Sequence, residues 1–352
     1  MSANAWAPST RGAYGRAVDG LQAGIDAEAQ RTGFAGVVRV DVGGETVAEA
    51  AFGLADRAHG VPNEVEGQLA LASGTKGLTA LVVARLVEDG RLALGTTARS
   101  LLGADLPLVE DAVTVEHLLA HRSGIGDYLD ESAGGDIDDH VLAVPVHQLD
   151  GAEAYLAVLD GYPSAFPPGE RFAYCNGGFV LLAILAERAA DEPYADLVAR
   201  LVCGPAGMTS TAFLRSNELP GRAAVGYLGG DGLRTNVLHL PMVGVGDGGA
   251  HSTVADVHRL WDALLAGRIL SPTMVAEVLR PRSETVEGER ALRYGLGFWL
   301  APTGDGVLLE GSDAGISFRS THEPTAQRTW TVISNTSEGA WPMLRHLDRA
   351  LA

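Results

Sequence analysis

The chain has 352 residues, a mass of 36.6 kDa and 46% hydrophobic residues. These values fit one large domain, or two closely joined domains, with a substantial core. The formal net charge of -18 weighs against nucleic acid or an anionic membrane surface as a partner. The N-terminus lacks the apolar core of a signal peptide, and no later stretch is apolar for the roughly 18 residues that a membrane span needs. Only two cysteines occur, Cys175 and Cys203, which fits a reducing compartment, so we expect a cytoplasmic protein.

The two ends of the chain carry the strand patterns. A first helix is expected over residues 12–32, followed by a hairpin whose strands, 34–42 and 46–52, meet at Gly43-Gly44. Near the other end, short strand-like runs precede a helical tail that begins at Trp341. These runs cover residues 296–301, 307–310, 316–320 and 329–334.

The middle of the chain has helical periodicity instead. The expected helices cover residues 77–88, 115–120, 152–160, 177–189, 195–201 and 255–266. We therefore expect an α/β (α+β) fold, in which residues 1–70 and 290–352 form a sheet domain and residues 71–289 form an inserted, mainly helical domain. The long Gly- and Pro-rich connectors 130–139 and 219–249 are of the kind that lines functional sites.

Lys76 is the only lysine, so 25 of the 26 lysine and arginine residues are arginines. Arginine serves solvation and surface pairing equally well, but it cannot release its proton in a protein, whereas a buried lysine can. Lys76 lies in Ser73-Gly-Thr-Lys76, which opens a helix with an apolar stripe. Ser73 and Lys76 are three residues apart and therefore share one helix face. The spacing alone also fits an N-cap serine followed by a solvated lysine, but solvation does not explain a single lysine.

This pairing has a chemical interpretation. A desolvated lysine has a lowered pKa and can accept the proton of a neighbouring serine hydroxyl. The helix N-terminus supplies N–H groups that can stabilise an oxyanion. In Tyr174-Cys-Asn176, a tyrosine near an ammonium can act as a general base, and the asparagine can hold both the lysine and a substrate amide. Taken alone, this second stretch also fits a packed tyrosine at a helix start.

Together these stretches resemble the serine β-lactamase and penicillin-binding-protein superfamily, in the branch with Tyr-x-Asn as its second motif. That branch holds class C β-lactamases, D-alanyl-D-alanine carboxypeptidases, D-aminopeptidases and family VIII esterases. Further segments resemble the family in the same order along the chain: 113–124 (VTVEHLLAHRSG), 167–176 (PPGERFAYCN), 204–208 (GPAGM), 248–256 (GGAHSTVAD) and 294–298 (YGLGF). The resemblance implies Ser73 as nucleophile, Lys76 as its proton acceptor, Tyr174 as general base and Asn176 as a polar contact. It also implies an antiparallel sheet, a helical domain and a site in the cleft between them.

The family's third motif, Lys-Thr-Gly or His-x-Gly, is where the chain departs from the pattern. The best match, Gly311-Ser312-Asp313-Ala314-Gly315, places Ser312 where the cation belongs, which puts β-lactamase and peptidase activities in doubt. The Gly315 N–H could still complete an oxyanion hole with that of Ser73. Asp313 would repel a carboxylate and favour an ammonium group, so we expect a neutral or amine-bearing substrate. An equally open interpretation is a strand-end aspartate that binds nearby backbone N–H groups.

Other site chemistries are less well supported. His117 and His121 have the i, i+4 spacing of a zinc pair, but the sequence offers no third ligand. Cys175 is more simply a small residue within the Tyr-x-Asn motif, and there is neither a G-x-S-x-G elbow nor a glycine-rich phosphate loop.

We therefore expect a serine hydrolase that forms an acyl-Ser73 intermediate on a small ester or amide and needs no metal or cofactor. An acyltransferase or cyclising enzyme would use the same residues with another acceptor. A β-lactamase or D-alanyl-D-alanine carboxypeptidase is a further alternative, and a non-catalytic binder is the least favoured, because all four residues of the first two motifs are intact.

Overall fold

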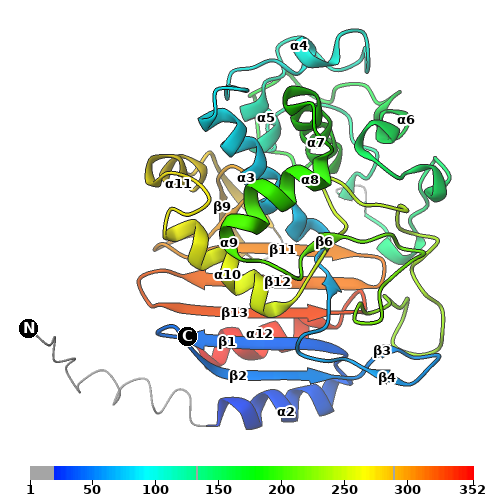
Figure 1. The fold of residues 1–352 in the computed structure, drawn as a ribbon, viewed down its shortest axis with the longest axis vertical. Helices are drawn as coiled ribbons and strands as arrows, with labels where there is room; N and C mark the ends of the chain where they lie inside the picture. Colours follow the sequence, from blue (N-terminus) through cyan, green and yellow to red (C-terminus); the bar gives the residue numbers. More distant parts are fainter. Residues whose placement is uncertain (1–19, 132–133, 288–289) are drawn as a thin grey trace, which may run out of the picture.

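In the computed structural model, the residues described are 20–131, 134–287 and 290–352. An eight-stranded antiparallel sheet, in the order β2-β1-β13-β12-β11-β10-β9-β8, crosses the molecule (Figure 1). Its strands are β1 (Gly36–Val42), β2 (Glu45–Phe52), β8 (Ser283–Glu287), β9 (Arg290–Tyr294), β10 (Trp299–Leu300), β11 (Val307–Asp313), β12 (Ile316–Glu323) and β13 (Arg328–Ser334).

The two ends of the chain meet in the middle of this sheet, because β1 pairs with β13 along its whole length, from Gly36 opposite Ser334 to Val42 opposite Arg328. The sheet is therefore assembled from both termini, as the sequence predicted. The β1–β2 turn uses Gly43 (φ 62°) and Gly44 (φ 81°), which adopt left-handed conformations without steric cost.

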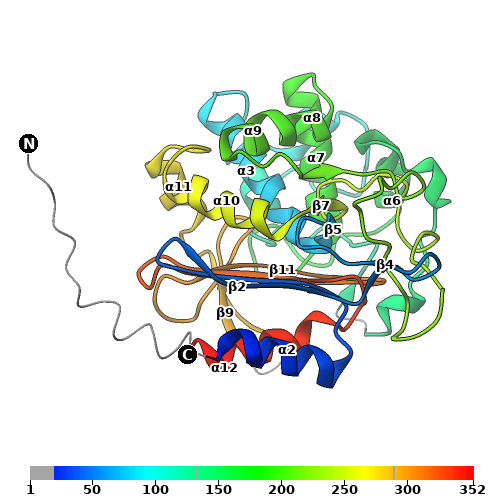
Figure 2. The same cartoon turned by 60° about the horizontal axis from the view of Figure 1, so that its bottom comes forward.

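Helices cover both faces of the sheet (Figure 2). On one face lie α2 (Leu21–Thr32) and α12 (Ala340–Ala350), whose apolar residues pack with β1 and β13 around Val38 and Trp330. On the other face a larger core surrounds α3 (Thr75–Glu88) and α7 (Asn176–Ala190). Since these two helices are buried on nearly all sides, they form a rigid base for the residues at their N-termini.

The remaining helices and short strands surround these two central helices. The helices are α4 (Ala98–Leu102), α5 (Val115–Leu119), α6 (Leu156–Leu159), α8 (Tyr194–Val198), α9 (Gly204–Ala206), α10 (Val254–Leu265) and α11 (Pro272–Val278). The 3-10 helices are η1 (Ala72–Gly74), η3 (Ile137–Asp139), η4 (Val146–Gln148) and η5 (Ala152–Tyr155), and η6 (Ala199–Cys203) is a π-helix. The short strands are β3 (Leu54–Asp56), β4 (Val61–Pro62), β5 (Leu69–Ala70), β6 (Ala212–Phe213) and β7 (Ala250–Ser252).

The sequence prediction missed the hairpin of β8 and β9 at the sheet edge. Its segments, SETVE and RALRY, are polar or charged at many positions, so they lack the apolar alternation that marks a strand. The predicted domain boundary at residue 289/290 falls inside this hairpin, and β8 belongs to the same sheet as β1. The division into two domains stays a prediction. Residues 12–19 of the predicted first helix lie outside the described residues.

Within the described part of the chain, no helix combines the length and the apolar character that crossing a membrane requires.

Candidate active site

Ser73 lies in η1, directly before α3 begins at Thr75. The preceding residue, Ala72, has φ 45°, a left-handed conformation that is rare for a residue with a side chain. Strand β11 passes against this turn: a Cβ added to Gly311 would lie 2.6 Å from Ser73 N and 2.8 Å from Gly74 N. The close approach therefore requires glycine at position 311, and it fixes Ser73 beside the edge of the sheet.

Lys76 is buried, with 2% of its surface exposed. Its Nζ lies 2.8 Å from Ser73 Oγ, 2.8 Å from Asn176 Oδ1 and 2.9 Å from the carbonyl oxygen of Asp247. Burial lowers the pKa of Lys76, and the nearby carboxylates of Asp247 and Glu131 oppose that shift. The amide and carbonyl oxygens can only accept hydrogens. An ammonium at this position donates to all three oxygens, whereas the neutral amine that a lowered pKa favours donates two hydrogens to Asn176 and Asp247 and can accept the Ser73 proton.

Asn176 is the first residue of α7, and its amide is fully used inside the protein. Its Oδ1 accepts from Lys76, while its Nδ2 donates to the carbonyl oxygen of Leu129 (3.2 Å) and to Glu131 Oε1 (2.9 Å). The predicted contact between Asn176 and Lys76 is thus present. The other predicted contact, to a substrate amide, would require Glu131 or Leu129 to move away, because both amide hydrogens are already engaged.

Asp127 fixes the position of Asn176. Its carboxylate accepts from the backbone N–H groups of Asn176 (2.7 Å) and Gly177 (2.8 Å) at the N-terminus of α7. Burial raises the pKa of Asp127 to about 6 although these hydrogen bonds favour the ionised form. Asp127 thus caps a buried helix N-terminus that carries a residue of the candidate site.

Tyr174 lies beside Lys76, whose Nζ is 5.0 Å from the centre of the phenol ring. The ring stacks on Trp299, with centroids 6.1 Å apart and an interplanar angle of 9°, and it contacts His121 at 4.3 Å. His121 also holds the backbone on both sides of Tyr174: its carbonyl accepts from Ala173 N (2.8 Å), and its Nδ1 accepts from Cys175 N (3.0 Å). Tyr174 is therefore held from its ring and from its backbone.

One cavity brings these groups together. It is lined by Ser73, Glu131, Tyr174, Trp299, Glu310, Gly311, Ser312 and Trp341. The nucleophile and the tyrosine predicted from sequence thus face the same space, and strand β11 forms one of its walls. Glu131, Trp299 and Trp341 were not expected there.

The prediction for Gly315 is wrong. Gly315 lies in the turn after β11, and its N–H donates to Ser337 Oγ at 2.8 Å, so it is not available to an oxyanion. Asp313 and Ile316 flank this two-residue turn as partners, and residues in that position exchange backbone hydrogen bonds. The next pair, Ser312 and Ser317, is then not hydrogen-bonded, and the Ser312 N–H points away from β12, toward the edge that faces Ser73.

The position expected for the third motif's cation also lies three residues earlier on β11 than the sequence analysis placed it, at Leu309 instead of Ser312. A Cβ added to Gly77 would meet Leu309 Cδ2 at 2.5 Å, so Leu309 is the β11 side chain that packs against α3 beside Lys76. Ser312 lines the cavity with Trp341 instead and does not take that position. From the sequence, the cation of the third motif was expected to be missing. Leu309 lies at that position of β11, so the position carries no cation.

The positions of His117, His121 and Cys175 do not support the zinc and cysteine-nucleophile interpretations. His117 and Thr114 form a reciprocal cap at the start of α5: Thr114 N donates to His117 Nδ1, and His117 N donates to Thr114 Oγ1. His121, in contrast, belongs to the tyrosine cluster, so the two imidazoles have separate structural roles. Burial raises the pKa of the Cys175 thiol well above its usual value, which is the opposite of what a nucleophilic cysteine needs.

Besides Trp299 and Trp341, the residues Asp127, Glu131 and Asp247 were not identified from the sequence as contributors to the site, and His121 was considered there only as a zinc ligand. The Asp247 contact to Lys76 is made by a backbone carbonyl, which leaves no signature in residue type. Asp127 and Glu131 lie in the SGIGDYLDE segment, where a Gly-Asp pair gives only a general turn signal.

The chain is similar to known proteins over nearly its whole length. Residues 18–351 match the family model described as Beta-lactamase. The chain belongs to that family. The chain is 31% identical to esterase EstB of Burkholderia gladioli over 74% of this chain and 74% of that protein. It is 26% identical to the putative penicillin-binding protein PbpX of Bacillus subtilis over 77% of this chain.

The match to PbpX spans only 63% of that protein's length. Among solved structures, a penicillin-binding protein from Bacillus halodurans superposes with a TM-score of 0.86 at 31% identity, over 92% of this chain and 99% of that one. The family and its fold, with an antiparallel sheet and mixed helices, are therefore established for this β-lactamase family member.

Proposed function

We propose that this β-lactamase family member is a serine hydrolase that cleaves small esters or amides through an acyl-Ser73 intermediate. The observation that carries the proposal is the contact between Lys76 Nζ and Ser73 Oγ at 2.8 Å, in a site where two other acceptors bind the same nitrogen. This arrangement supports a neutral lysine as the group that removes the serine proton. The esterase name of the relative EstB supports the same reaction class.

In the first half-reaction, Ser73 Oγ attacks the substrate carbonyl carbon and its proton passes to Lys76 Nζ. The resulting oxyanion faces the backbone N–H groups of Ser73 and Ser312. The bond to the leaving alcohol or amine then breaks as that group receives a proton, which moves from Lys76 through the Tyr174 hydroxyl. The products are the acyl-Ser73 ester and the free leaving group.

In the second half-reaction, water attacks the acyl-Ser73 carbonyl carbon and gives its proton to Tyr174 and Lys76. The ester bond to Ser73 breaks, the serine oxygen regains a proton from the same pair, and the carboxylic acid leaves. Because the same residues act in both halves, the lysine and the tyrosine return to their starting protonation states.

The surroundings of Ser73 favour substrates without a carboxylate near the scissile bond. Four acidic residues act electrostatically on Lys76, namely Asp127, Glu131, Asp247 and Asp313, and Leu309 takes the β11 position that packs beside Lys76. Lys76 is the basic residue among the main influences on the pKa of Asp313, and the acidic Asp247 and Glu131 act in the opposite direction. We therefore expect β-lactams and D-alanyl-D-alanine peptides to be poorer substrates than neutral or amine-bearing esters and amides.

A serine-reactive fluorophosphonate tests the proposal. The intact protein should gain one adduct mass, peptide mapping should locate it on Ser73, and Ser73→Ala should abolish it. Ser123→Ala is the matched control, because Ser123 is a buried serine outside the cavity and its removal should leave labelling intact. An unlabelled protein, or an adduct that persists in Ser73→Ala, would refute the proposal.

A further inference from the structure

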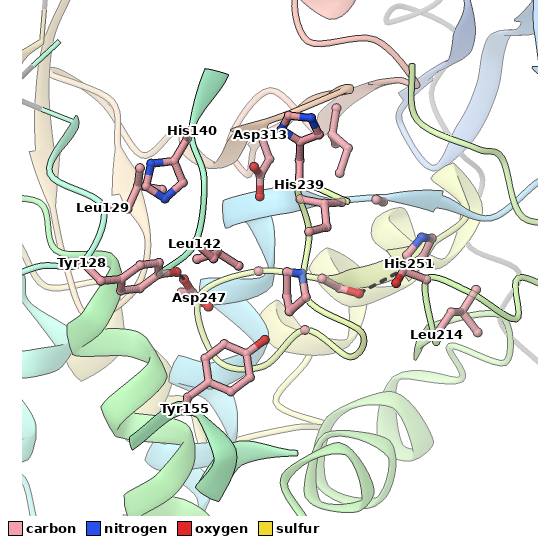
Figure 3. A pocket seen from close by; sticks show the side chains of 18 residues that line it. Tyr128, Leu129, His140, Leu142, Tyr155, Leu214, His239, Asp247, His251 and Asp313 are labelled. Carbon is pink, nitrogen blue, oxygen red and sulfur yellow. Dashed lines mark hydrogen bonds between the residues drawn. The ribbon is translucent and has the colours of Figure 1, made fainter. Parts of the chain in front are cut away.

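A second pocket adjoins the catalytic residues on the side of the Asp247 loop (Figure 3). Its walls come from β5, β7, the end of β11, residues 128–129 and 140–142, and the connector 214–249. Both Asp247 and Asp313 point into it, together with Tyr128 and Tyr155. The pocket shares no lining residue with the cavity that holds Ser73 and Tyr174, and it meets the catalytic residues at Asp247, whose carbonyl oxygen lies 2.9 Å from Lys76 Nζ.

Asp313 is a carboxylate without a compensating cation. Its Oδ1 accepts from the backbone N–H of Ala314 at 2.8 Å, and no ion pair to Asp313 occurs among residues 20–131, 134–287 and 290–352. Burial, together with the neighbouring charge of Asp247, raises the pKa of Asp313 to about 7. A half-buried carboxylate in this state is stabilised by any cation that enters the pocket.

Asp247 adds a second acidic group to the same pocket. Its side chain accepts from the Tyr128 hydroxyl, and only 9% of the residue is exposed. Burial raises the pKa of Asp247, which Lys76 partly offsets. Since the backbone of Asp247 also contacts Lys76 Nζ, this acidic pocket lies next to the residue that activates Ser73.

His251 provides an independent indication of the ligand. It is 9% exposed and lines the same pocket. Its Nδ1 lies 3.2 Å from the carbonyl oxygen of Gly249, which can only accept, so Nδ1 carries the hydrogen. Burial lowers the pKa of His251 to about 4, so the ring is neutral and its Nε2 is an acceptor. The pocket therefore presents an imidazole acceptor in addition to two carboxylates.

The position of Tyr174 decides which part of a substrate reaches this pocket. The residue that protonates the leaving alcohol or amine must lie beside that leaving group. Tyr174, which has this role in the proposed function, lines the cavity of Ser73 and Trp299. The leaving group then occupies that cavity. The acyl part is then left to the pocket of Asp247 and Asp313, which adjoins Lys76 through the Asp247 carbonyl.

We propose that this pocket binds a primary ammonium group on the acyl part of the substrate, with Asp313 and Asp247 as its principal acceptors. The substrates are then aminoacyl esters or amides rather than plain acyl ones. This inference rests on the proposed function, because the acyl part is the part of the substrate that becomes attached to Ser73. An ammonium group has three hydrogens to donate, which suits a pocket with several acceptors.

The test measures protection of Ser73 from the fluorophosphonate by two ligands of nearly the same shape. D- and L-alaninamide carry the ammonium group, and isobutyramide carries a methyl group in its place. At pH 7.5, at least one alaninamide enantiomer should slow labelling at a concentration about tenfold lower than isobutyramide does. This difference should shrink at least about fivefold in Asp313→Asn and persist in Asp231→Asn, which removes an exposed carboxylate outside the pocket.

Equal protection by alaninamide and isobutyramide, or an undiminished difference in Asp313→Asn, would overturn the ammonium pocket while leaving the proposed function intact. A protein that the fluorophosphonate does not label at all would instead overturn the proposed function. The two failures are therefore distinguishable in one experiment.

Discussion

Lys76 Nζ and Ser73 Oγ lie 2.8 Å apart, inside a core where Lys76 is almost completely buried. The two other partners of the lysine nitrogen, Asn176 Oδ1 and the Asp247 carbonyl, can only accept. The geometry therefore fits a lysine that donates two hydrogens and takes a third from serine. The proposed role of Lys76 as proton acceptor accounts for one lysine in a chain whose other basic Lys/Arg positions are all arginine.

Replacement of Lys76 by arginine should keep the fold and lower kcat/KM for an ester by about 10²–10⁴-fold. The positive charge remains, but a guanidinium does not accept the serine proton. Arg268→Lys is the control, because Arg268 is exposed and its replacement should leave turnover unchanged. Circular dichroism would verify the fold, and wild-type turnover in Lys76→Arg would contradict the assigned role of the lysine.

His121 is expected to position Tyr174 without touching the substrate. His121→Asn suits the left-handed backbone at this site (φ 53°), but it removes the ring that contacts Tyr174 at 4.3 Å. We expect kcat to fall about tenfold with little change in KM, because a small misplacement of a proton-transfer group slows chemistry more than binding. His117→Asn, in the cap of α5, should not show this split. A rise in KM alone would argue against a positioning role.

Gly311→Ala should abolish most activity although it adds a single methyl group. The new Cβ would lie 2.6 Å from Ser73 N, so β11 and the Ser73 turn must separate, and both proposed oxyanion donors move. A loss of at least about 10²-fold in kcat/KM is expected. Gly95→Ala is the matched control, because nothing lies within 4 Å of its added Cβ. Full activity of Gly311→Ala would show that the strand does not support the oxyanion.

Asp313 should make the free protein less stable as the pH rises. Its pKa is about 7 in the folded state, against 3.8 as the reference value. The folded protein thus binds more protons than the unfolded one between these values, and stability falls as pH rises through this window. Asp313→Asn should therefore gain stability relative to wild type between pH 4 and pH 8, by at most about 4 kcal/mol. Chemical denaturation at both pH values measures this gain, and a pH-independent difference would contradict it.

The residues proposed to act through their side chains could be predicted from the sequence, because they lie in short local motifs. Ser73, Lys76, Tyr174 and Asn176 come from local motifs at the N-termini of α3 and α7, and the structure brings them into contact range. The pairing of the terminal strands was also foreseeable, because strand patterns gather at the two ends of the chain.

The third motif was not resolved from the sequence because it depends on strand register. Both Gly311 and Gly315 are glycines near the end of β11, and residue type does not show which one faces Ser73. The structure decides this through the turn at Ala314-Gly315 and the close approach of Gly311 to Ser73 N. Similarly, the role of Asp247 depends on a backbone carbonyl, and that of His121 on packing across the core.

The most direct test of the central claim is mass spectrometry of the acid-quenched enzyme during turnover of a p-nitrophenyl ester. We predict that the peptide containing Ser73 gains the mass of the acyl group, with a burst of p-nitrophenol of about one equivalent per enzyme. Both signals should disappear in Ser73→Ala. Hydrolysis that proceeds without an acylated Ser73 peptide, or that survives in Ser73→Ala, would contradict the account.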